Sequence, residues 1–337
     1  MNIKFSPGFP IETIKTRPPS MWRYKEAIPV SNPVSYGEGY TPIVKETISG
    51  NDVLLKLEYL FPSGSFKDRG ASILISKARE LGFKHVVEDS SGNAGAAIAA
   101  YSAKAGITCD IYVPEGTSPG KLTQISSYGA NLCIVKGSRE DTTKAAMIAT
   151  EQHYYASHIW NPYFLQGTKT FSYEVTEQLG WKAPDTVICP VGHGTLLLGA
   201  YLGFLELKEA SIIDHLPRII GVQTESCPPL AEAWRKGKND YSKIVKKETL
   251  GEGISIAEPI RAPQILKAVR KTGGEIIMVS ELQILTALKS MLRKGYYIEP
   301  TSATVVAGLN LLNDLGQTVI PLTGTGLKTT EKLGRIL

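Results

Sequence analysis

A lysine, an aspartate and an arginine stand side by side in the stretch FPSGSFKDRG, residues 61–70. The stretch lies where a hydrophobic, strand-like run gives way to an amphipathic helical pattern. Charged residues at such a junction are often ordinary solvated surface. A lysine at the end of a strand can instead hold an electrophile, because its amine is a nucleophile when it is unprotonated. Both interpretations stay open on this stretch alone.

A second candidate is the stretch DSSGNAG, residues 89–95, which follows a strand pattern and precedes a helix pattern. Its backbone N–H groups, with the side chains of Ser90, Ser91 and Asn93, are suited to bind an anion at a helix N-terminus. The same residues also suit an ordinary helix cap, in which serine and asparagine are favoured. The residues alone favour neither interpretation.

A third candidate is the stretch PVGHGTLLLG, residues 190–199. Gly192 and Gly194 permit a close approach of the backbone, and Thr195 adds a hydroxyl where the helix pattern begins, so the stretch has the features of a phosphate-binding loop. It matches neither GxxxxGK[ST] nor a complete GxGxxG, and so gives little support to a nucleotide site. We interpret His193 as a loop residue and predict no metal site, because no second ligand lies at metal-binding spacing.

The fourth candidate is the stretch PLTGTGLK, residues 321–328, in which Thr323 follows the last strand pattern. By itself it is equally well a glycine turn with an incidental threonine. The four stretches share one position, the passage from a strand to a helix. Parallel α/β sheets bind ligands at the carboxyl ends of their strands, so the four together make a cofactor site more plausible than any one does.

Apolar strand patterns alternate with helical patterns along most of the chain. Strands this apolar predict parallel sheets covered by helices on both faces, so we expect an α/β fold with two lobes, each a mostly parallel sheet. One helix should end at Gly82 in a C-terminal cap. The expected strands are residues 51–60, 84–89, 108–114, 130–137, 185–191, 218–224, 275–280 and 317–323. The expected helices include residues 71–82, 93–106, 119–129, 139–152, 194–207, 281–295 and 301–316.

The composition is that of a soluble globular protein, with 42% hydrophobic and 20% charged residues among 337. No stretch approaches the roughly 20 apolar residues that a membrane helix needs. The net charge of +5 is dispersed among acidic residues, which argues against a nucleic-acid partner but suits an anionic cofactor or substrate. We therefore expect neither a membrane nor a nucleic-acid partner.

The cysteines and the N-terminal residues bear on the compartment. The four cysteines form no CxxC pair, and Cys109, Cys133 and Cys189 lie in apolar strand patterns, so we expect reduced, buried thiols. The first fifteen residues, MNIKFSPGFPIETIK, have no continuous apolar core and no small-residue cleavage site, so we expect no secretory signal. A cytoplasmic location is the expectation.

In this order and spacing, the four stretches resemble those of the pyridoxal-phosphate (PLP) enzymes of fold type II, the tryptophan-synthase-β-like group. Within this group the chain is most similar to threonine synthase. YGEGYTPIVK, residues 36–45, resembles the GEGxTPL motif of that family, and WNPYFLQGTKT, residues 160–170, resembles its NPxRxEGQKT segment. SGSFKDRG and TGTGLK are similar to its lysine motif and to its TGxGLK ending. The resemblance covers about residues 21–328 and is more specific for the cofactor than for the reaction.

The resemblance implies a role for each matching residue. Lys67 would form a Schiff base with PLP and then move protons at the substrate Cα and beyond. Asn93 would donate a hydrogen bond to the ring hydroxyl, and Thr323 would face the ring nitrogen. A neutral hydroxyl there favours elimination and replacement over transamination. The phosphate would be held by the backbone of Gly192, His193, Gly194, Thr195 and Leu196. The substrate carboxylate would meet Ser90, Ser91 and Gly92.

The resemblance also implies an arrangement of domains. A small domain of residues 76–158 would be inserted in a large PLP-binding domain formed by residues 1–75 and 159–337. The partner would be a small amino-acid substrate, and we expect a homodimer. Asp68 and Arg69 would be structural: a carboxylate at the helix start and a partner that fixes the lysine turn.

The chain departs from threonine synthase where that family binds a phosphate dianion. The family has an Asn-Ser pair before its NP and an arginine two residues after it, whereas this chain has His158 and Ile159 before and Phe164 after. Ala94 replaces the threonine of the family's SSGNT. Apolar side chains would desolvate a dianion without pairing its charge, which is costly. We therefore expect a smaller or less charged leaving group, with His158 and Ala94 at the substrate, unless another cation such as Arg261 has taken over.

Several functions stay open beside elimination or replacement by a threonine-synthase-like enzyme. They are threonine synthase proper acting on O-phosphohomoserine, a cysteine-synthase-like β-replacement, and a serine/threonine dehydratase-like activity. A dehydrogenase would need GxGxxG after the first strand and an acidic residue about twenty positions later, and this arrangement is absent. A PLP-binding protein without turnover is also possible, although the intact lysine motif argues against it.

Overall fold

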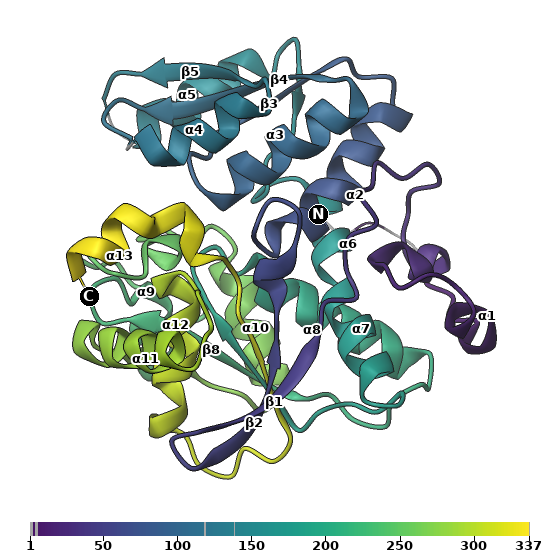
Figure 1. Cartoon of the computed structure of the whole chain (residues 1–337), viewed down its shortest axis with the longest axis vertical. Coiled ribbons are helices and arrows are strands. Elements are labelled where there is room, and N and C mark those ends of the chain that lie inside the picture. Colours follow the sequence, from purple (N-terminus) through teal and green to yellow (C-terminus); the bar gives the residue numbers. More distant parts are fainter. Residues whose placement is uncertain (1–2, 4–5, 118, 138, 337) are drawn as a thin grey trace. The chain divides into compact units, whose positions relative to one another are not determined.

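The computed structural model describes residues 3, 6–117, 119–137 and 139–336 (Figure 1). Its backbone contacts divide the chain into two compact units. The first unit comprises Met1–Tyr40 and Phe61–Thr170, and the second comprises Thr41–Leu60 and Phe171–Leu337. Each unit is described by itself below.

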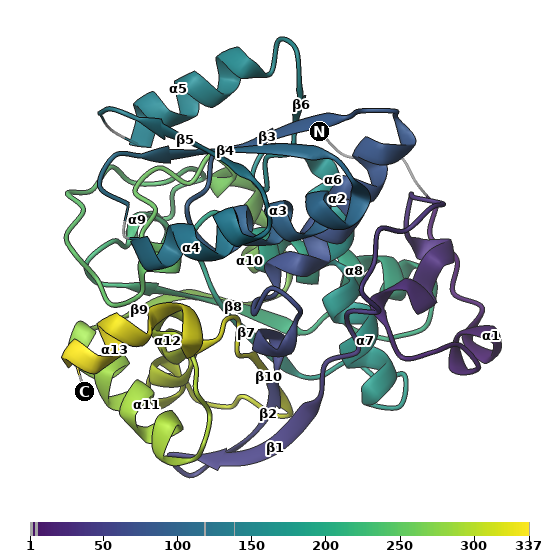
Figure 2. The same ribbon diagram turned by 45° about the horizontal axis from the view of Figure 1, so that its top comes forward.

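The first unit contains a four-stranded parallel sheet in the order β5-β4-β3-β6. β4 has one buried face and one more exposed face. Cys109, Ile111 and Val113 alternate along the strand and are buried in the hydrophobic core of this unit, while the residues next to them are at most partly buried. In Figure 2, α5 covers one face of this sheet, and α3 and α4 lie on the other. The strands are β3 (His85–Glu88), β4 (Thr108–Pro114), β5 (Asn131–Val135) and β6 (Tyr154–Tyr155).

Small residues bring the helices of the first unit close together. The alanine-rich α3 packs against α2, and α2 in turn packs against α6. A side chain at Gly70 would overlap the Phe164 ring, and one at Gly167 would overlap the carbonyl oxygen of Arg69, so α2 and α6 can touch only through glycine. The helices are α1 (Ile11–Lys15), η1 (Met21–Ala27), α2 (Lys67–Glu80), α3 (Asn93–Ala105), α4 (Pro119–Ser127), α5 (Arg139–Ala149) and α6 (Pro162–Thr168).

The second unit contains a six-stranded sheet in the order β1-β2-β10-β7-β8-β9. All neighbouring pairs are parallel except the β1–β2 hairpin, which is antiparallel. The strands are β1 (Ile43–Ile48), β2 (Asn51–Lys56), β7 (Thr186–Pro190), β8 (Arg218–Thr224), β9 (Ile276–Val279) and β10 (Thr318–Pro321).

Helices of the second unit pack on this sheet in two groups. α12 lies against β7, β8, β9 and β10 and is covered by α11, while α8 and α10 pack together on β8. Ile188 of β7 joins the hydrophobic core formed with α11 and α12. The helices are η2 (Glu58–Leu60), α7 (Thr170–Gln178), α8 (Thr195–Glu209), α9 (Pro229–Arg235), η3 (Glu252–Ile254), α10 (Ala262–Lys271), α11 (Glu281–Arg293), α12 (Pro300–Gly308), η4 (Leu309–Leu311), η5 (Gly326–Thr329) and α13 (Thr330–Ile336).

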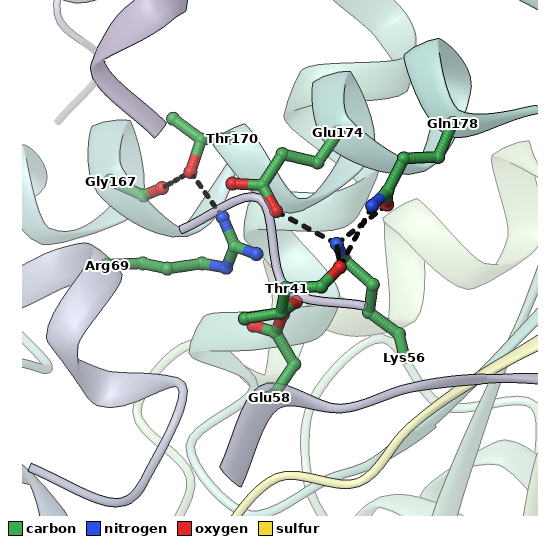
Figure 3. A network of polar contacts seen from close by, with 8 residues as sticks. All are labelled: Thr41, Lys56, Glu58, Arg69, Gly167, Thr170, Glu174 and Gln178. Atoms are coloured by element: carbon green, nitrogen blue, oxygen red, sulfur yellow. Dashed lines mark hydrogen bonds and ion pairs between the residues drawn. The ribbon is translucent and has the colours of Figure 1, made fainter. Parts of the chain in front are cut away.

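A buried lysine joins the first hairpin of the second unit to α7 (Figure 3). The Nζ of Lys56 donates to the Thr41 carbonyl at 2.6 Å, to Glu174 Oε2 at 2.9 Å and to Gln178 Oε1 at 2.8 Å. The Thr41 hydroxyl donates in turn to the buried Glu58 at 2.7 Å. Lys56 and Glu174 are both fully buried, so their charges are paired away from water.

The expected elements are largely found. The strands predicted at residues 108–114 and 218–224 have those bounds, and Gly82 follows α2 with a φ of +83°, which confirms its capping role. Several bounds differ from the prediction, and the start of one helix was wrong, because α2 begins at Lys67 and not at residue 71. The strand expected at residues 51–60 ends at Lys56, and the helix expected at residues 301–316 ends at Gly308.

Other features went unpredicted or differ in detail. β1 and β6 were not expected, and the antiparallel β1–β2 pair is an exception to the parallel pattern. Cys109 and Cys189 are buried as expected, but Cys133 is only half-buried because β5 is an edge strand. No described helix combines the length and apolar character needed to cross a membrane.

The predicted domain division into residues 76–158 and the remainder stays a prediction. All strands of the four-stranded sheet lie within residues 76–158, and all strands of the six-stranded sheet lie outside them. By compactness, however, residues 1–40, 61–75 and 159–170 also group with the first unit.

Candidate functional site

Lys67 is the first residue of α2 and is half-buried. Its Nζ lies 4.9 Å from the ring centroid of Phe66 and 5.9 Å from that of Phe164. The chain reaches the helix through a tight turn in which Gly64 has a φ of +83° and donates to the Phe61 carbonyl at 2.7 Å. The turn and the two rings hold the amine in a partly dry setting at the start of a helix.

The residues beside Lys67 form the scaffold of this turn. The buried carboxylate of Asp68 accepts hydrogen bonds from the backbone N–H of Ser63, at 2.8 Å, and from the Ser63 hydroxyl. Arg69 is buried, donates to the Thr170 hydroxyl at 2.9 Å (Figure 3) and lies over the Phe61 ring at 4.8 Å. These contacts agree with the structural role expected for the two charged residues.

Ser65 lies two residues before Lys67 and is fully buried. Its hydroxyl oxygen has no hydrogen-bond partner among the residues that the structure describes. A buried hydroxyl rarely stays without a partner in a folded protein. A polar ligand held beside Lys67 is a natural partner for it.

The loop of Ser90, Ser91 and Gly92 follows β3 and leads into α3. The N-cap of α3 is Gly92, and no described side chain caps this helix, so the ordinary cap that serine or asparagine would form is not present there. A side chain at Gly95 would overlap the carbonyl oxygen of Ser90, so the loop folds closely onto the first turn. The N–H groups and positive dipole end of α3 are therefore suited to an anion. Asn93 is the first helical residue, and Ala94 is buried.

His158 lies three residues beyond β6 and is 6% exposed. Its Nδ1 lies 2.5 Å from Oε1 of Glu88, the last residue of β3 and fully buried. Its ring meets that of Phe164 edge-on, with 5.9 Å between centroids. Ile159 and Phe164 are both buried. They stand where the family that the chain resembles has polar residues.

Sequence reasoning missed Glu88. The one available signal was the pair of acidic residues that ends the strand pattern KHVVED. β3 and β6 are parallel neighbours, and the pairing of Val87 with Tyr155 places their carboxyl ends side by side. This pairing brings Glu88 to His158, although they are far apart in the sequence.

In the second unit, the glycine loop lies between β7 and α8. Gly194 is the N-cap of α8 with a φ of +75°, and no side chain of the described residues caps the helix. A side chain at Gly194 would overlap Ile265, and one at Gly192 would come within 3.0 Å of the Ile254 Cα. Close packing therefore requires glycine at both positions. The loop leads directly to the first backbone N–H groups of a long helix. His193 is half-buried, and Thr195 and Leu196 are buried.

Thr323 follows β10 and is 1% exposed. Its Oγ1 lies 3.1 Å from the Ser302 hydroxyl and donates to Glu299 Oε1 at 3.4 Å. The Ser302 hydroxyl also accepts the N–H of Gly324 at 3.1 Å. Ser302 and Glu299 were not predicted from the sequence, because they lie at the start of α12 and meet Thr323 only through the fold of the second unit.

Arg261, the alternative cation, is the N-cap of α10 in the second unit. It is buried, and its Nη1 donates to Gln264 Oε1 at 2.9 Å. Burial lowers the pKa of its guanidinium. Among the described residues, no three His, Cys, Asp or Glu side chains are grouped so that they could hold a metal ion.

The predicted site residues thus form two sets. Lys67, His158 and the loop of residues 90–94 belong to the first unit, and residues 192–196 and Thr323 belong to the second. Except for Lys67, which begins α2 after a tight turn, they lie at the carboxyl ends of strands. In the second unit, the closely packed Gly192 and Gly194 at the start of α8 fit a phosphate group. In the first unit, the start of α3 fits an anion, and the buried Ser65 hydroxyl beside Lys67 fits a polar group.

The comparisons with known proteins agree with this geometry. The family described as pyridoxal-phosphate dependent enzyme matches residues 34–324. Threonine synthase of Methanocaldococcus jannaschii is 37% identical, over 95% of this chain and 83% of that protein. Threonine synthase of Mycobacterium tuberculosis is 32% identical, over 96% of this chain and 92% of that protein.

Solved structures show the same fold. Maize serine racemase superposes with a TM-score of 0.76 at 23% identity, over 88% of this chain and 92% of that chain. Threonine deaminase isoform 2 of Solanum lycopersicum superposes with a TM-score of 0.76 at 20% identity, over 100% of this chain and 95% of that chain. The predicted fold class, cofactor and family are confirmed. The chain therefore belongs to the pyridoxal-phosphate dependent enzymes and is a threonine-synthase-like, PLP-dependent lyase of fold type II.

Proposed function

We propose that this enzyme eliminates or replaces a leaving group on a small amino acid, and that the leaving group is not a phosphate dianion. The observation that carries the second part is the burial of Ile159 and Phe164. Phe164 packs against Gly70 with no space between them and next to the His158 ring. Two buried apolar side chains offer a dianion no charge and no hydrogen bond, and desolvating it there would be costly.

The cofactor assignment is part of the same proposal. Lys67 would hold PLP covalently, Asn93 would donate to the ring hydroxyl, and Thr323 would face the ring nitrogen. When bound, PLP stabilises negative charge at the substrate Cα. Lys67 would take a proton from the substrate Cα and return it. Its amine is placed for this at the start of α2, near the rings of Phe66 and Phe164. The start of α8, which no described side chain caps, supports the assignment of the phosphate to Gly192, His193, Gly194, Thr195 and Leu196.

The substrate carboxylate is proposed to bind at Ser90, Ser91 and Gly92. The lack of a cap on α3 from any described side chain supports this, because the first N–H groups of the helix are then suited to an anion. Ala94 follows directly and contributes no hydroxyl of its own. His158 is proposed to lie at the substrate end that carries the leaving group.

Threonine synthase proper is the second candidate. It is favoured by 37% identity to the Methanocaldococcus jannaschii protein named threonine synthase. In that case a cation from elsewhere, such as Arg261, would have to pair with the phosphate of O-phosphohomoserine. The hydrogen bond between Arg261 and Gln264 would then have to be exchanged for one to the substrate.

Two measurements test the proposal. The purified protein with PLP should show a visible absorbance band that borohydride removes, leaving a tag on Lys67; a protein without such a band would contradict the cofactor assignment. Incubation with O-phosphohomoserine should release little phosphate. Efficient phosphate release with formation of threonine would refute the altered leaving group and establish the second candidate.

We also propose that the protein is cytoplasmic and a homodimer. Four free cysteines, three of them buried, support a reducing compartment. The dimer is proposed from the family resemblance. Light scattering of the purified protein checks the dimer, and a mass corresponding to the 36.6 kDa chain alone would contradict it.

A further inference from the structure

A carboxylate and an imidazole meet in the interior of the first unit. Glu88 ends β3 with an exposed fraction of 0%, and His158 is 6% exposed. Glu88 Oε1 lies 2.5 Å from His158 Nδ1, within hydrogen-bond distance. A hydrogen bond between a carboxylate and an imidazolium is charge-assisted. Buried carboxylates are costly unless they are paired, so this contact helps to explain why Glu88 can lie in the core.

The contact fixes which ring nitrogen can do chemistry. A carboxylate that engages Nδ1 keeps the proton of a neutral imidazole on that nitrogen, and it stabilises the imidazolium when Nε2 is protonated as well. The ring is also held in one orientation. Any proton that the ring exchanges with a bound molecule then passes through Nε2.

The pair and the proposed proton carrier, Lys67, share a neighbour, Phe164. Phe164 contacts the His158 ring edge-on, and the Nζ of Lys67 lies 5.9 Å from the centroid of the same Phe164 ring. Ser90 and Ser91, the proposed carboxylate loop, begin two residues after Glu88. All of these groups belong to the first unit, so their arrangement is independent of the second.

The neighbouring acid is engaged with other groups. The carboxylate of Asp89 accepts the Thr143 hydroxyl at 2.8 Å and the Tyr155 hydroxyl at 2.9 Å. Burial, with Asp89 and then Glu88 nearby, raises the pKa of Tyr155 above its ordinary value, so this phenol stays protonated. Glu88 is therefore the carboxylate that orients His158, and the Tyr155 phenol donates its hydrogen bond to Asp89.

We propose that His158, oriented by Glu88, donates the proton that a departing oxygen needs when the substrate loses it. This inference rests on the proposed function. The step is a β-elimination in which Lys67 Nζ takes the Cα proton, and the C–H electron pair becomes the Cα–Cβ double bond. The Cβ–O pair leaves with oxygen, which takes the proton from His158 Nε2. Glu88 is a positioning residue, since it acts through His158.

The role predicts a dependence on the leaving group. A hydroxyl leaves as water only with a proton, whereas chloride leaves without one. In His158→Asn, the rate of water loss from L-serine should fall about 10²-fold to 10⁴-fold, the usual contribution of a general acid. Chloride loss from β-chloro-L-alanine should stay near the wild-type rate. Glu88→Gln should lower water loss by less than His158→Asn does, because the amide oxygen can still accept from Nδ1 but carries no charge.

The same strand offers a matched control. His85 begins β3 at the opposite end of the strand, and its Nε2 lies 2.9 Å from Asp110 Oδ2. His85→Asn should change neither reaction. A readout independent of turnover is the proton NMR spectrum of the protein labelled with ¹⁵N-histidine. A strongly downfield Nδ1–H signal should be present in the wild type, shifted in Glu88→Gln and lost in His158→Asn.

The outcomes separate this inference from the proposed function. If the wild type shows no visible band with PLP, the proposed function fails. If the band is present but neither leaving group is removed, the donor role is refuted and the proposed function stands. If the band is present but His158→Asn slows both reactions equally, or the downfield signal is missing, the role of the Glu88–His158 pair is refuted and the proposed function stands. A wild type that removes chloride but not hydroxyl also refutes the donor role.

Discussion

The amine of Lys67 lies near two aromatic rings, and this neighbourhood determines what a substitution there should do. Lys67→Ala removes the amine and places a good helix former at the start of α2, so the fold should persist. Turnover and the visible band should be lost. Lys77→Ala, on the same helix with its Nζ bound to Glu80, is the matched control and should keep both. Full activity in Lys67→Ala would exclude the proposed mechanism.

Thr323 is neutral but lies beside a carboxylate. Thr323→Asp would place a second acid within reach of Glu299, and one of two adjacent carboxyl groups then has its pKa raised. A carboxylate at the ring nitrogen should favour the protonated pyridine and so increase amino-group transfer relative to elimination. Product analysis by mass spectrometry checks this, with Thr323→Ser as the control. Unchanged rates and products would show that Thr323 does not contact the cofactor ring.

Residues that belong to a glycine-rich motif could be found from the sequence, and residues that meet them across strands could not. Lys67, Asn93 and Thr323 could be proposed because the stretches that contain them resemble motifs of a known family, and their roles stay predictions. Glu88 and Glu299 are not, because each is brought to its partner by the pairing order of strands or by the packing of α12. β6 was missed for a related reason, since two residues give no periodic signal.

At the scale of elements, a buried ion pair joins β2 to α7. Lys56→Met would leave Glu174 without its cation in the core, at a cost of about 3–5 kcal/mol in the free energy of unfolding. Urea denaturation measures the loss. The double substitution Lys56→Met with Glu174→Leu should recover much of it, because apolar pairs of similar size often replace a buried ion pair without loss. A single variant as stable as the wild type would contradict the expectation.

The start of α8 gives a second test at this scale. Gly194→Ala places a side chain on a residue with a φ of +75° and against Ile265, so it should cost about 1–3 kcal/mol and weaken PLP binding. Gly237 has a φ of +63° but no described atom within 4 Å of an added side chain. Gly237→Ala should therefore keep full affinity for PLP in a fluorescence titration, and an equal effect of the two substitutions would count against the role of the loop.

The element pattern itself was well predicted where strands are apolar and helices are long. β4 and β8 were found with their bounds because both alternate with clear helical segments. The helix predicted through residues 301–316 fails because its apolar pattern continues past Gly308 into a 3₁₀ turn, Leu309–Leu311. The hairpin of β1 was missed because its strand is only partly buried and carries charges.

At the scale of the whole molecule, the reactivity of the cysteine thiols depends on how tightly each unit is packed around them. Burial raises the pKa of Cys109 and of Cys189 to about 12, so both stay protonated and unreactive near neutral pH. Cys133 is half-buried on an edge strand. A thiol reagent should therefore label Cys133 first in the native protein, and Cys109 and Cys189 only on unfolding. Rapid labelling of Cys189 in the native state would contradict this packing.

The sheet order of the second unit has a consequence for how the protein is made. β2 leaves the ribosome early, but its parallel neighbour β10 is translated only after the remaining strands of both sheets. Until then the hairpin of β1 and β2 has an unsatisfied edge, and such edges invite pairing with other chains. All strands of the four-stranded sheet in the first unit are translated well before that point, so the first unit can fold before the second. The nascent hairpin is thus the segment for which a chaperone would matter most.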